Sequence, residues 1–158
     1  MIKIIAVGKI KEKYLSDAVN EYSKRINAYT RLNIIQVNDE SCPERASGSV
    51  MEQVKMREGQ RILDNISDKD YVITLEIKGR KLSSEHFAEH MESLRVEGRS
   101  DVAFVIGGSL GLSPEVSARA DFKLSFSDMT FPHQLMRVIL LEQIYRSYKI
   151  ARNEPYHK

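Results

Sequence analysis

The chain has 158 residues, of which 42% are hydrophobic and 29% are charged, and its formal net charge is +2. These values are typical of one soluble globular domain over residues 1–158, and they exclude a disordered or low-complexity chain. Cys42 is the only cysteine, which excludes an internal disulfide and favours a reducing, cytoplasmic setting. No apolar run is long enough to span a membrane. The mild basicity permits a polyanionic partner but does not require one.

The first half of the chain alternates between patterns typical of strands and of helices. Short apolar runs, most of them rich in β-branched residues, predict strands at residues 2–7, 32–37 and 71–77. Apolar residues spaced three and four apart predict helices over residues 12–30 and 50–66. We expect Gly59 to weaken the second helix and Gly79 to end the third strand.

The second half continues the same alternation. Ser83 or Ser84 can cap a helix that closes at Gly98, and a buried strand follows at residues 101–106. Further on, Ser113 and Pro114 begin a helix, residues 122–126 form a strand, and residues 135–150 form the last helix. Regular alternation of this kind predicts an α/β fold, a sheet with helices on both faces.

Two of these strands end in loops suited to binding a ligand. Gly107, Gly108 and Gly111 follow the strand at residues 101–106, and glycine lets the main chain turn sharply or approach a ligand closely. Ser127, Asp128, Met129 and Thr130 follow the strand at residues 122–126. Because the carboxyl ends of parallel strands share one edge of a sheet, these loops predict a ligand cleft at that edge.

Several other interpretations of these motifs are weaker. His86, Glu89 and His90 have the H-x-x-E-H spacing of some zinc sites, but no third ligand is evident, and an exposed polar face is the favoured explanation. The glycines read G-G-x-x-G, which is not the G-x-G-x-x-G of dinucleotide-binding folds, although Asp128 lies about twenty residues on. A tight turn without a ligand is also compatible with the glycines alone.

The last helix is apolar on nearly all sides. Its residues include Leu135, Val138, Leu141, Ile144 and Tyr148. A helix of this kind needs cover on more than one face, either from the sheet or from a second copy of the chain. We expect a homodimer.

Four segments together identify a family resemblance that covers essentially the whole chain. The opening IIAVGKIKEKY, the loop GGSLG, the segment SFSDMTFPHQ and the closing PYHK resemble the ribosomal RNA large subunit methyltransferase H family, which is of the SPOUT class. The resemblance implies a Rossmann-like, mostly parallel sheet whose carboxyl-terminal segment forms a trefoil knot. It also implies a homodimer that uses S-adenosylmethionine, without a metal, to methylate N3 of a pseudouridine. The implied target lies in the helix 69 loop of 23S rRNA in assembled 70S ribosomes.

The resemblance also assigns roles to residues. The positions that match the cofactor site of the family are Leu75, Gly107, Phe126, Ser127, Asp128, Met129, Thr130 and Phe131. Apolar side chains at Leu75, Ile106, Leu124 and Phe126 could form the walls of an adenine slot. Tyr156 and His157 match residues that complete the active site, with the tail expected to reach across the dimer. The residue that would accept the N3 proton is not identified.

Basic residues near the carboxyl terminus suggest contacts with RNA phosphates. Arg137, Arg152 and Lys158 are the expected RNA-binding residues, and Arg146 and Lys149 belong to the same basic strip. Asn153 stands where many relatives have glycine, and it can adopt the left-handed conformation that a bend requires. The alternative function is a ribosome-binding assembly factor without catalysis.

Overall fold

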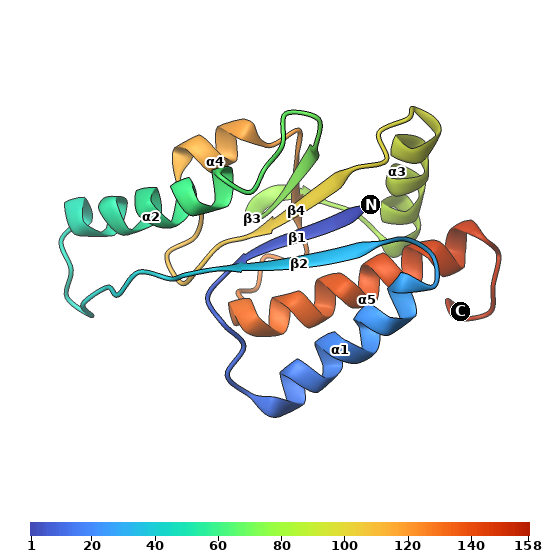
Figure 1. Ribbon diagram of the computed structural model, residues 1–158, viewed down its shortest axis with the longest axis horizontal. Coiled ribbons are helices and arrows are strands. Elements are labelled where there is room, and N and C mark those ends of the chain that lie inside the picture. Colours follow the sequence, from blue (N-terminus) through green and yellow to red (C-terminus); the bar gives the residue numbers. More distant parts are fainter.

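The computed structural model describes all 158 residues as alternating strands and helices around one sheet (Figure 1). All five strands are parallel, and their order in the sheet is β2-β1-β4-β3-β5. The predicted α/β fold is therefore confirmed. The elements are β1 (Ile2–Val7), α1 (Lys13–Asn27), β2 (Leu32–Val37), α2 (Gly48–Leu63), β3 (Tyr71–Lys81), α3 (Ser84–Val96), β4 (Val102–Ile106), α4 (Pro114–Arg119), β5 (Phe122–Ser125) and α5 (His133–Ala151).

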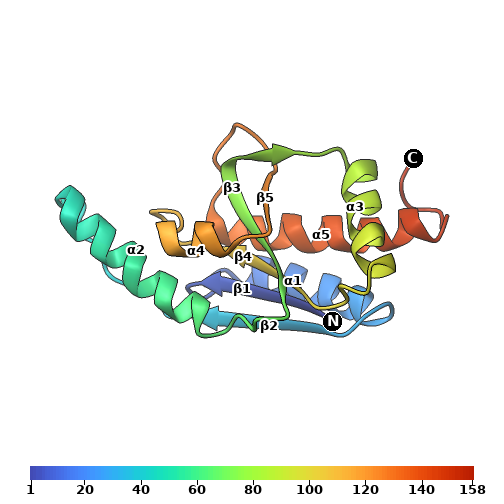
Figure 2. The ribbon, with the colours of Figure 1, turned by 90° about the horizontal axis from the view of Figure 1, so that it is seen from above.

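Helices cover both faces of the sheet, as Figures 1 and 2 show. Side chains of a strand point alternately to its two faces, so β1 contributes to two cores. Ile2, Ile4 and Ala6 pack in the larger core, which includes residues of α1, α3 and α5. Ile5 and Val7 pack in the smaller core, which includes residues of α2 and α4. The sheet is buried on both sides, which explains the nearly continuous apolar composition of β1 and β4.

Helix α5 packs against the sheet and against two neighbouring helices, α1 and α3. Leu140, Leu141 and Ile144 are fully buried there, so much of the cover that this helix needs comes from its own chain. Leu135 and Val138 remain only partly covered. No helix of the structure is both long and apolar enough to cross a membrane.

Two glycines have roles that differ from those expected. Strand β3 does not end at Gly79 but continues to Lys81, with an irregularity in its pairing with β5 after Leu75. A Cβ at residue 79 would lie 2.7 Å from the carbonyl oxygen of Lys123, so this glycine lets the two strands approach closely. Helix α2 likewise continues through Gly59. A Cβ there would lie 2.4 Å from Ser113 Oγ, so that glycine allows close packing of α2 against the start of α4.

Candidate functional site

A cavity of about 530 Å³ opens at the carboxyl edge of the sheet, where the sequence predicts a ligand cleft. Its walls come from the middle of β3, the loop after β4, and the end of β5 with the segment that joins it to α5. The four expected wall residues, Leu75, Ile106, Leu124 and Phe126, all line it. This size and this apolar lining are typical of sites for a nucleotide-sized ligand.

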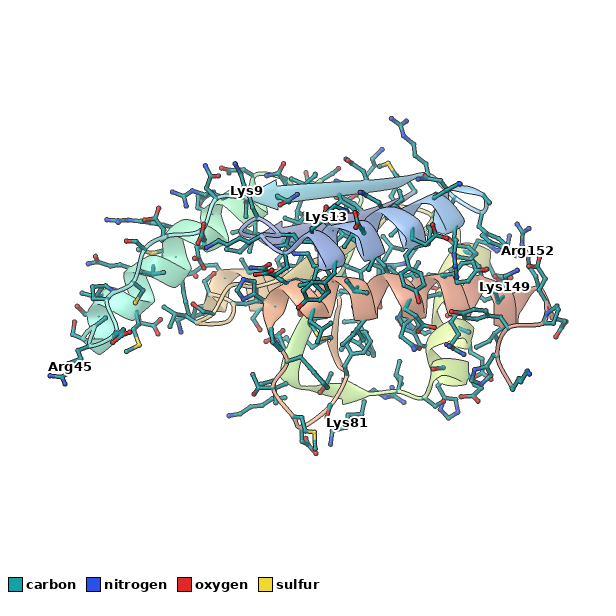
Figure 3. The ribbon with its side chains drawn as sticks, turned by 90° about the horizontal axis from the view of Figure 1, so that it is seen from below. Lys9, Lys13, Arg45, Lys81, Lys149 and Arg152 are labelled. Atoms are coloured by element: carbon teal, nitrogen blue, oxygen red, sulfur yellow. The ribbon has the colours of Figure 1, made fainter.

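The structure brings seven of the eight expected cofactor residues to this cavity. They are Leu75, Gly107, Phe126, Ser127, Met129, Thr130 and Phe131. Asp128 does not line the cavity. Its carboxylate is exposed and pairs with Lys81, which lies at the end of β3 (Figure 3). The side chain of Asp128 therefore ties two walls of the site together from outside.

The glycine-rich loop folds tightly on itself. The amide of Gly111 donates a hydrogen bond of 3.1 Å to the carbonyl of Gly108, and Gly111 has a φ of 85°. A Cβ at Gly107 would lie 2.9 Å from the carbonyl carbon of Gly111 and from Leu112 Cδ2. The turn itself therefore requires glycine at residue 107, whether or not a ligand is bound. The loop then ends at Ser113, whose Oγ accepts the amide of Val116 and caps α4, as predicted.

Two titratable side chains line the cavity, Glu76 and His133. His133 is the first residue of α5 and is partly buried. Burial and, secondarily, the positive charge of Arg137 lower the pKa of His133, which favours its neutral form. Glu76 was not among the residues expected from the sequence. It lies within β3, next to Leu75, and the available signal was a lone carboxylate in an otherwise apolar strand segment beside an expected cavity residue.

Arg137 is not placed to contact RNA. Its side chain is almost fully buried, with 2% of the residue exposed. One terminal nitrogen donates hydrogen bonds to the carbonyl oxygens of Val7, at 2.8 Å, and Gly8, at 2.7 Å. Arg137 therefore joins the start of α5 to the end of β1 and holds the chain where β1 leaves the sheet.

The carboxyl-terminal tail packs against its own chain and is not frayed. The ring of Tyr156 lies edge-on to Tyr145, with centroids 4.9 Å apart, and its hydroxyl is 3.2 Å from Glu142 Oε1. His157 lies between Arg146 Nη1, at 3.1 Å, and Glu85 Oε1, at 2.7 Å. Asn153 forms the bend before the tail, with a φ of 52° in the left-handed region, as predicted.

This tail lies away from the cavity of its own chain. Glu142, which Tyr156 contacts, is six residues along α5 from Met136, the nearest residue of this helix that lines the cavity, or roughly 9 Å at the rise of an α-helix. Neither Tyr156 nor His157 lines the cavity. Burial raises the pKa of Tyr156 to about 12, so its hydroxyl stays protonated and can donate a hydrogen bond at neutral pH.

The remaining basic residues of the expected strip differ in how free their side chains are to contact RNA. Arg146 pairs with Glu142 at 2.6 Å, and Lys149 pairs with Glu154 at 2.7 Å. Arg152 is exposed and lies over the ring of Tyr29, with its guanidinium carbon 4.7 Å from the ring centroid. Figure 3 places Lys149 and Arg152 together at the carboxyl end of α5. Lys158, at the end of the tail, is exposed.

The H-x-x-E-H segment lies on α3, and only part of it is an exposed polar face. His90 is partly buried, and its ring centroid lies 4.6 Å from that of Phe122. Burial lowers the pKa of His90. His86 is exposed. No three histidine, cysteine, aspartate or glutamate side chains come together as a metal-binding group.

Comparisons with known proteins find relatives that match this chain over nearly its whole length. Residues 1–157 match the family described as "Predicted SPOUT methyltransferase". The chain is 57%, 56% and 54% identical to proteins named ribosomal RNA large subunit methyltransferase H from Clostridium kluyveri, Clostridium acetobutylicum and Enterococcus faecalis, each over 99% of both chains. It also resembles the solved structure of a probable methylase family protein from Haemophilus influenzae, with a TM-score of 0.54 and 13% identity, over 99% of this chain and 70% of the other. This last likeness concerns the fold alone.

Proposed function

The chain belongs to the ribosomal RNA large subunit methyltransferase H family of SPOUT methyltransferases, and on this basis we propose that it methylates N3 of a pseudouridine in the helix 69 loop of 23S rRNA. The methyl donor is S-adenosylmethionine, and the substrate is the assembled 70S ribosome in the cytoplasm. The observation that carries the proposal is the cavity of about 530 Å³ at the carboxyl edge of the sheet, lined by seven of the residues expected to hold the donor. Family membership also implies a knotted carboxyl-terminal segment.

The residues at the cavity fit such a donor. Apolar side chains of Leu75, Ile106 and Leu124 suit a flat adenine ring, and main-chain groups of the loop after β5 can meet its polar edge. When bound, S-adenosylmethionine supplies an activated methyl group on a positively charged sulfur. The chain then has to hold the pseudouridine so that N3 is aligned with that methyl, and alignment of this kind can lower a barrier by about 7–11 kcal/mol.

We also propose that the enzyme acts as a homodimer in which the tail of one subunit completes the cavity of the other. Tyr156 contacts Glu142, roughly 9 Å along α5 from Met136 at the cavity, and His157 contacts Arg146, about one turn further on. A two-fold axis crossing α5 between these points would bring the tail of one subunit to the cavity of its partner. The partly covered apolar residues Leu135 and Val138 lie on the stretch of α5 that such an axis would cross.

In this arrangement the tail would act on the ribosomal base and not on the donor. The protonated hydroxyl of Tyr156 can donate a hydrogen bond to a base oxygen. His157 could orient the base or accept its N3 proton, a contribution of about 10²–10⁴-fold for a well-placed base. Arg152 and Lys158 are exposed beside the tail, and we propose them as contacts to rRNA phosphates.

Methyl transfer to ribosomes tests this function. Ribosomes from a strain that lacks the modification should accept label from S-adenosylmethionine at a single pseudouridine of 23S rRNA, and base analysis should locate the methyl at N3. Free 23S rRNA should be labelled poorly, because the proposed substrate is the assembled particle. Normal donor binding without any labelling of 70S ribosomes would contradict the proposed substrate. A non-catalytic assembly factor would instead bind ribosomes but give no heat with S-adenosylmethionine in calorimetry.

A further inference from the structure

Glu76 is the only acidic side chain that lines the cavity. It follows Leu75 where the pairing of β3 with β5 becomes irregular. No lysine or arginine lines the cavity, and His133 is the only other titratable residue there. The cavity therefore presents a single carboxylate among mostly apolar and small side chains.

The carboxylate of Glu76 is held in place from both sides. Thr74 Oγ1, which is fully buried, donates a hydrogen bond of 2.6 Å to Glu76 Oε2. Ser117 Oγ, on α4, donates one of 2.9 Å to Glu76 Oε1. Each carboxylate oxygen has room for a second partner, because an ionised carboxylate can accept about four hydrogen bonds in all. Two hydroxyl donors fix the position of the negative charge without neutralising it.

Glu76 differs in this respect from Asp70 and Glu142, although the buried Glu58, which accepts the amide of Glu40 at 3.0 Å, also has no ion-pair partner. The buried Asp70 pairs with Lys3 at 2.7 Å, and the partly buried Glu142 pairs with Arg146 at 2.6 Å. Glu76 is also partly buried, yet both of its partners are neutral hydroxyls. Acidic side chains withdrawn from water are normally paired with a cation. Because Glu76 lines the cavity, a cationic group of a ligand bound there can reach its carboxylate.

The proposed methyl donor carries suitable cations. S-adenosylmethionine has a positive sulfonium and a positive ammonium, whereas its adenosine part is uncharged. We infer that Glu76 pairs with one of these positive centres and so makes the cavity select a charged donor over a neutral adenosine derivative. The inference rests on the proposed function, since it requires the donor to bind in this cavity. It assigns Glu76 a role in donor specificity that is separate from the shape of the adenine slot.

Calorimetry with three ligands tests this role. S-adenosylmethionine carries both positive centres, S-adenosylhomocysteine carries only the ammonium, and 5′-methylthioadenosine carries neither. The variant E76Q should bind S-adenosylmethionine at least about tenfold more weakly than the wild type, the loss of one charge-assisted contact. Its affinity for 5′-methylthioadenosine should change by less than about twofold. An equal loss for both ligands, or no loss for either, would overturn the inference.

Binding of S-adenosylhomocysteine shows which positive centre Glu76 contacts. A loss for S-adenosylhomocysteine that matches the loss for S-adenosylmethionine places Glu76 at the ammonium. A loss confined to S-adenosylmethionine places it at the sulfonium. Both results support the pairing of Glu76 with a positive centre, and they differ in whether the enzyme discriminates between donor and spent product.

Controls separate this role from a structural one. E89Q removes an exposed carboxylate on α3 and should leave all three affinities unchanged. S117A removes one hydroxyl donor but keeps the charge of Glu76, so it should preserve the preference for S-adenosylmethionine over 5′-methylthioadenosine.

If E76Q does not fold, the salt dependence of binding to the wild type still provides a test. Raising the salt concentration should weaken binding of S-adenosylmethionine but not of 5′-methylthioadenosine, and equal salt dependence would contradict the inference.

These measurements also distinguish a failure of this inference from a failure of the proposed function. A wild-type chain that binds none of the three ligands would overturn both the proposed donor and the role of Glu76. A wild-type chain that binds S-adenosylmethionine normally, together with an E76Q variant that binds it equally well, would leave the proposed function intact and reject only this inference.

Discussion

Arg137 illustrates how the environment of a single residue decides its role. In the sequence it belongs to a basic strip and looks available to RNA. In the structure its guanidinium is enclosed and donates hydrogen bonds to two main-chain carbonyls at the end of β1. Burial lowers the pKa of this arginine, because the charge is removed from water. The hydrogen bonds hold the end of β1 against the start of α5.

We predict that Arg137→Met destabilises the fold. The substitution keeps much of the apolar length but leaves the carbonyls of Val7 and Gly8 without a partner, which should cost about 1–3 kcal/mol. Urea unfolding measures this loss. Arg45→Met, in an exposed loop far from α5 (Figure 3), should change the stability by less than about 0.5 kcal/mol. Normal stability of Arg137→Met combined with weaker ribosome binding would show that Arg137 acts on RNA after all.

His90 gives the fold a dependence on acid pH. Burial lowers its pKa in the folded state, so the unfolded chain, with an ordinary pKa of about 6.5, takes up a proton first as the pH falls. The stabilisation is therefore complete above about pH 6.5 and is lost as the pH falls through the lower pKa of the folded state. His133 should add to the same trend, because its pKa is lowered in the same direction.

We predict that His90→Phe reduces this acid sensitivity. The new ring can keep the contact with Phe122 but cannot bind a proton. The difference between the unfolding free energies measured at about pH 7.5 and about pH 5.5 should be smaller in the variant than in the wild type. A variant with an unchanged difference would mean that His90 takes up its proton equally in both states.

At the scale of elements, patterns of apolar residues located nearly every strand and helix. The first two strands have the predicted bounds, and the helices differ at their ends by a few residues. Alternation and periodicity are local properties, so sequence reasoning recovers them well. The packing roles of Gly59 and Gly79 were missed because they depend on a second element that lies far away in the sequence. The same reason explains Glu76, whose importance comes from Ser117 on α4 and from the walls of a cavity.

The packing of α2 against α4 can be tested with two substitutions. Gly59→Ala should be destabilising although alanine favours helices, because its Cβ would lie 2.4 Å from Ser113 Oγ. Ser113→Ala should lose a helix cap worth about 1 kcal/mol. The double variant should be less destabilised than the sum of the two, because removal of Oγ relieves the clash. Additive losses in urea unfolding would show that the two residues do not compete for the same space.

At the scale of the whole molecule, the sheet edge carries the cavity and the far part of α5 carries the tail. The sequence predicted both regions, but their separation along α5 emerges only in three dimensions. The expected role of Tyr156 and His157 then depends on a second subunit, since these residues do not reach the cavity of their own chain.

We predict that two inactive variants restore activity when they form mixed dimers. Deletion of residues 156–158 keeps the cavity but removes the tail, whereas Gly107→Val keeps the tail but disrupts the glycine turn, where a Cβ would lie 2.9 Å from Gly111. Each homodimer should be inactive. Co-purified at equal amounts, they should recover about a quarter of the wild-type sites, because half of the dimers are mixed and each mixed dimer has one complete site.

Two results would contradict this prediction. Mixed dimers that form but remain inactive would show that cavity and tail do not combine across subunits. Full methyl transfer by the tail-deleted chain alone would show that Tyr156 and His157 are not needed. Donor affinity serves as the control, since deletion of the tail should leave binding of S-adenosylmethionine unchanged.

The most direct test is a crystal structure of the full chain with S-adenosylhomocysteine bound. We predict that the nucleoside occupies the cavity between Leu75, Gly107 and Thr130, and that Tyr156 of a second subunit lies at its open side. A nucleoside bound elsewhere on the chain, or a cavity closed by the tail of its own subunit, would contradict the account.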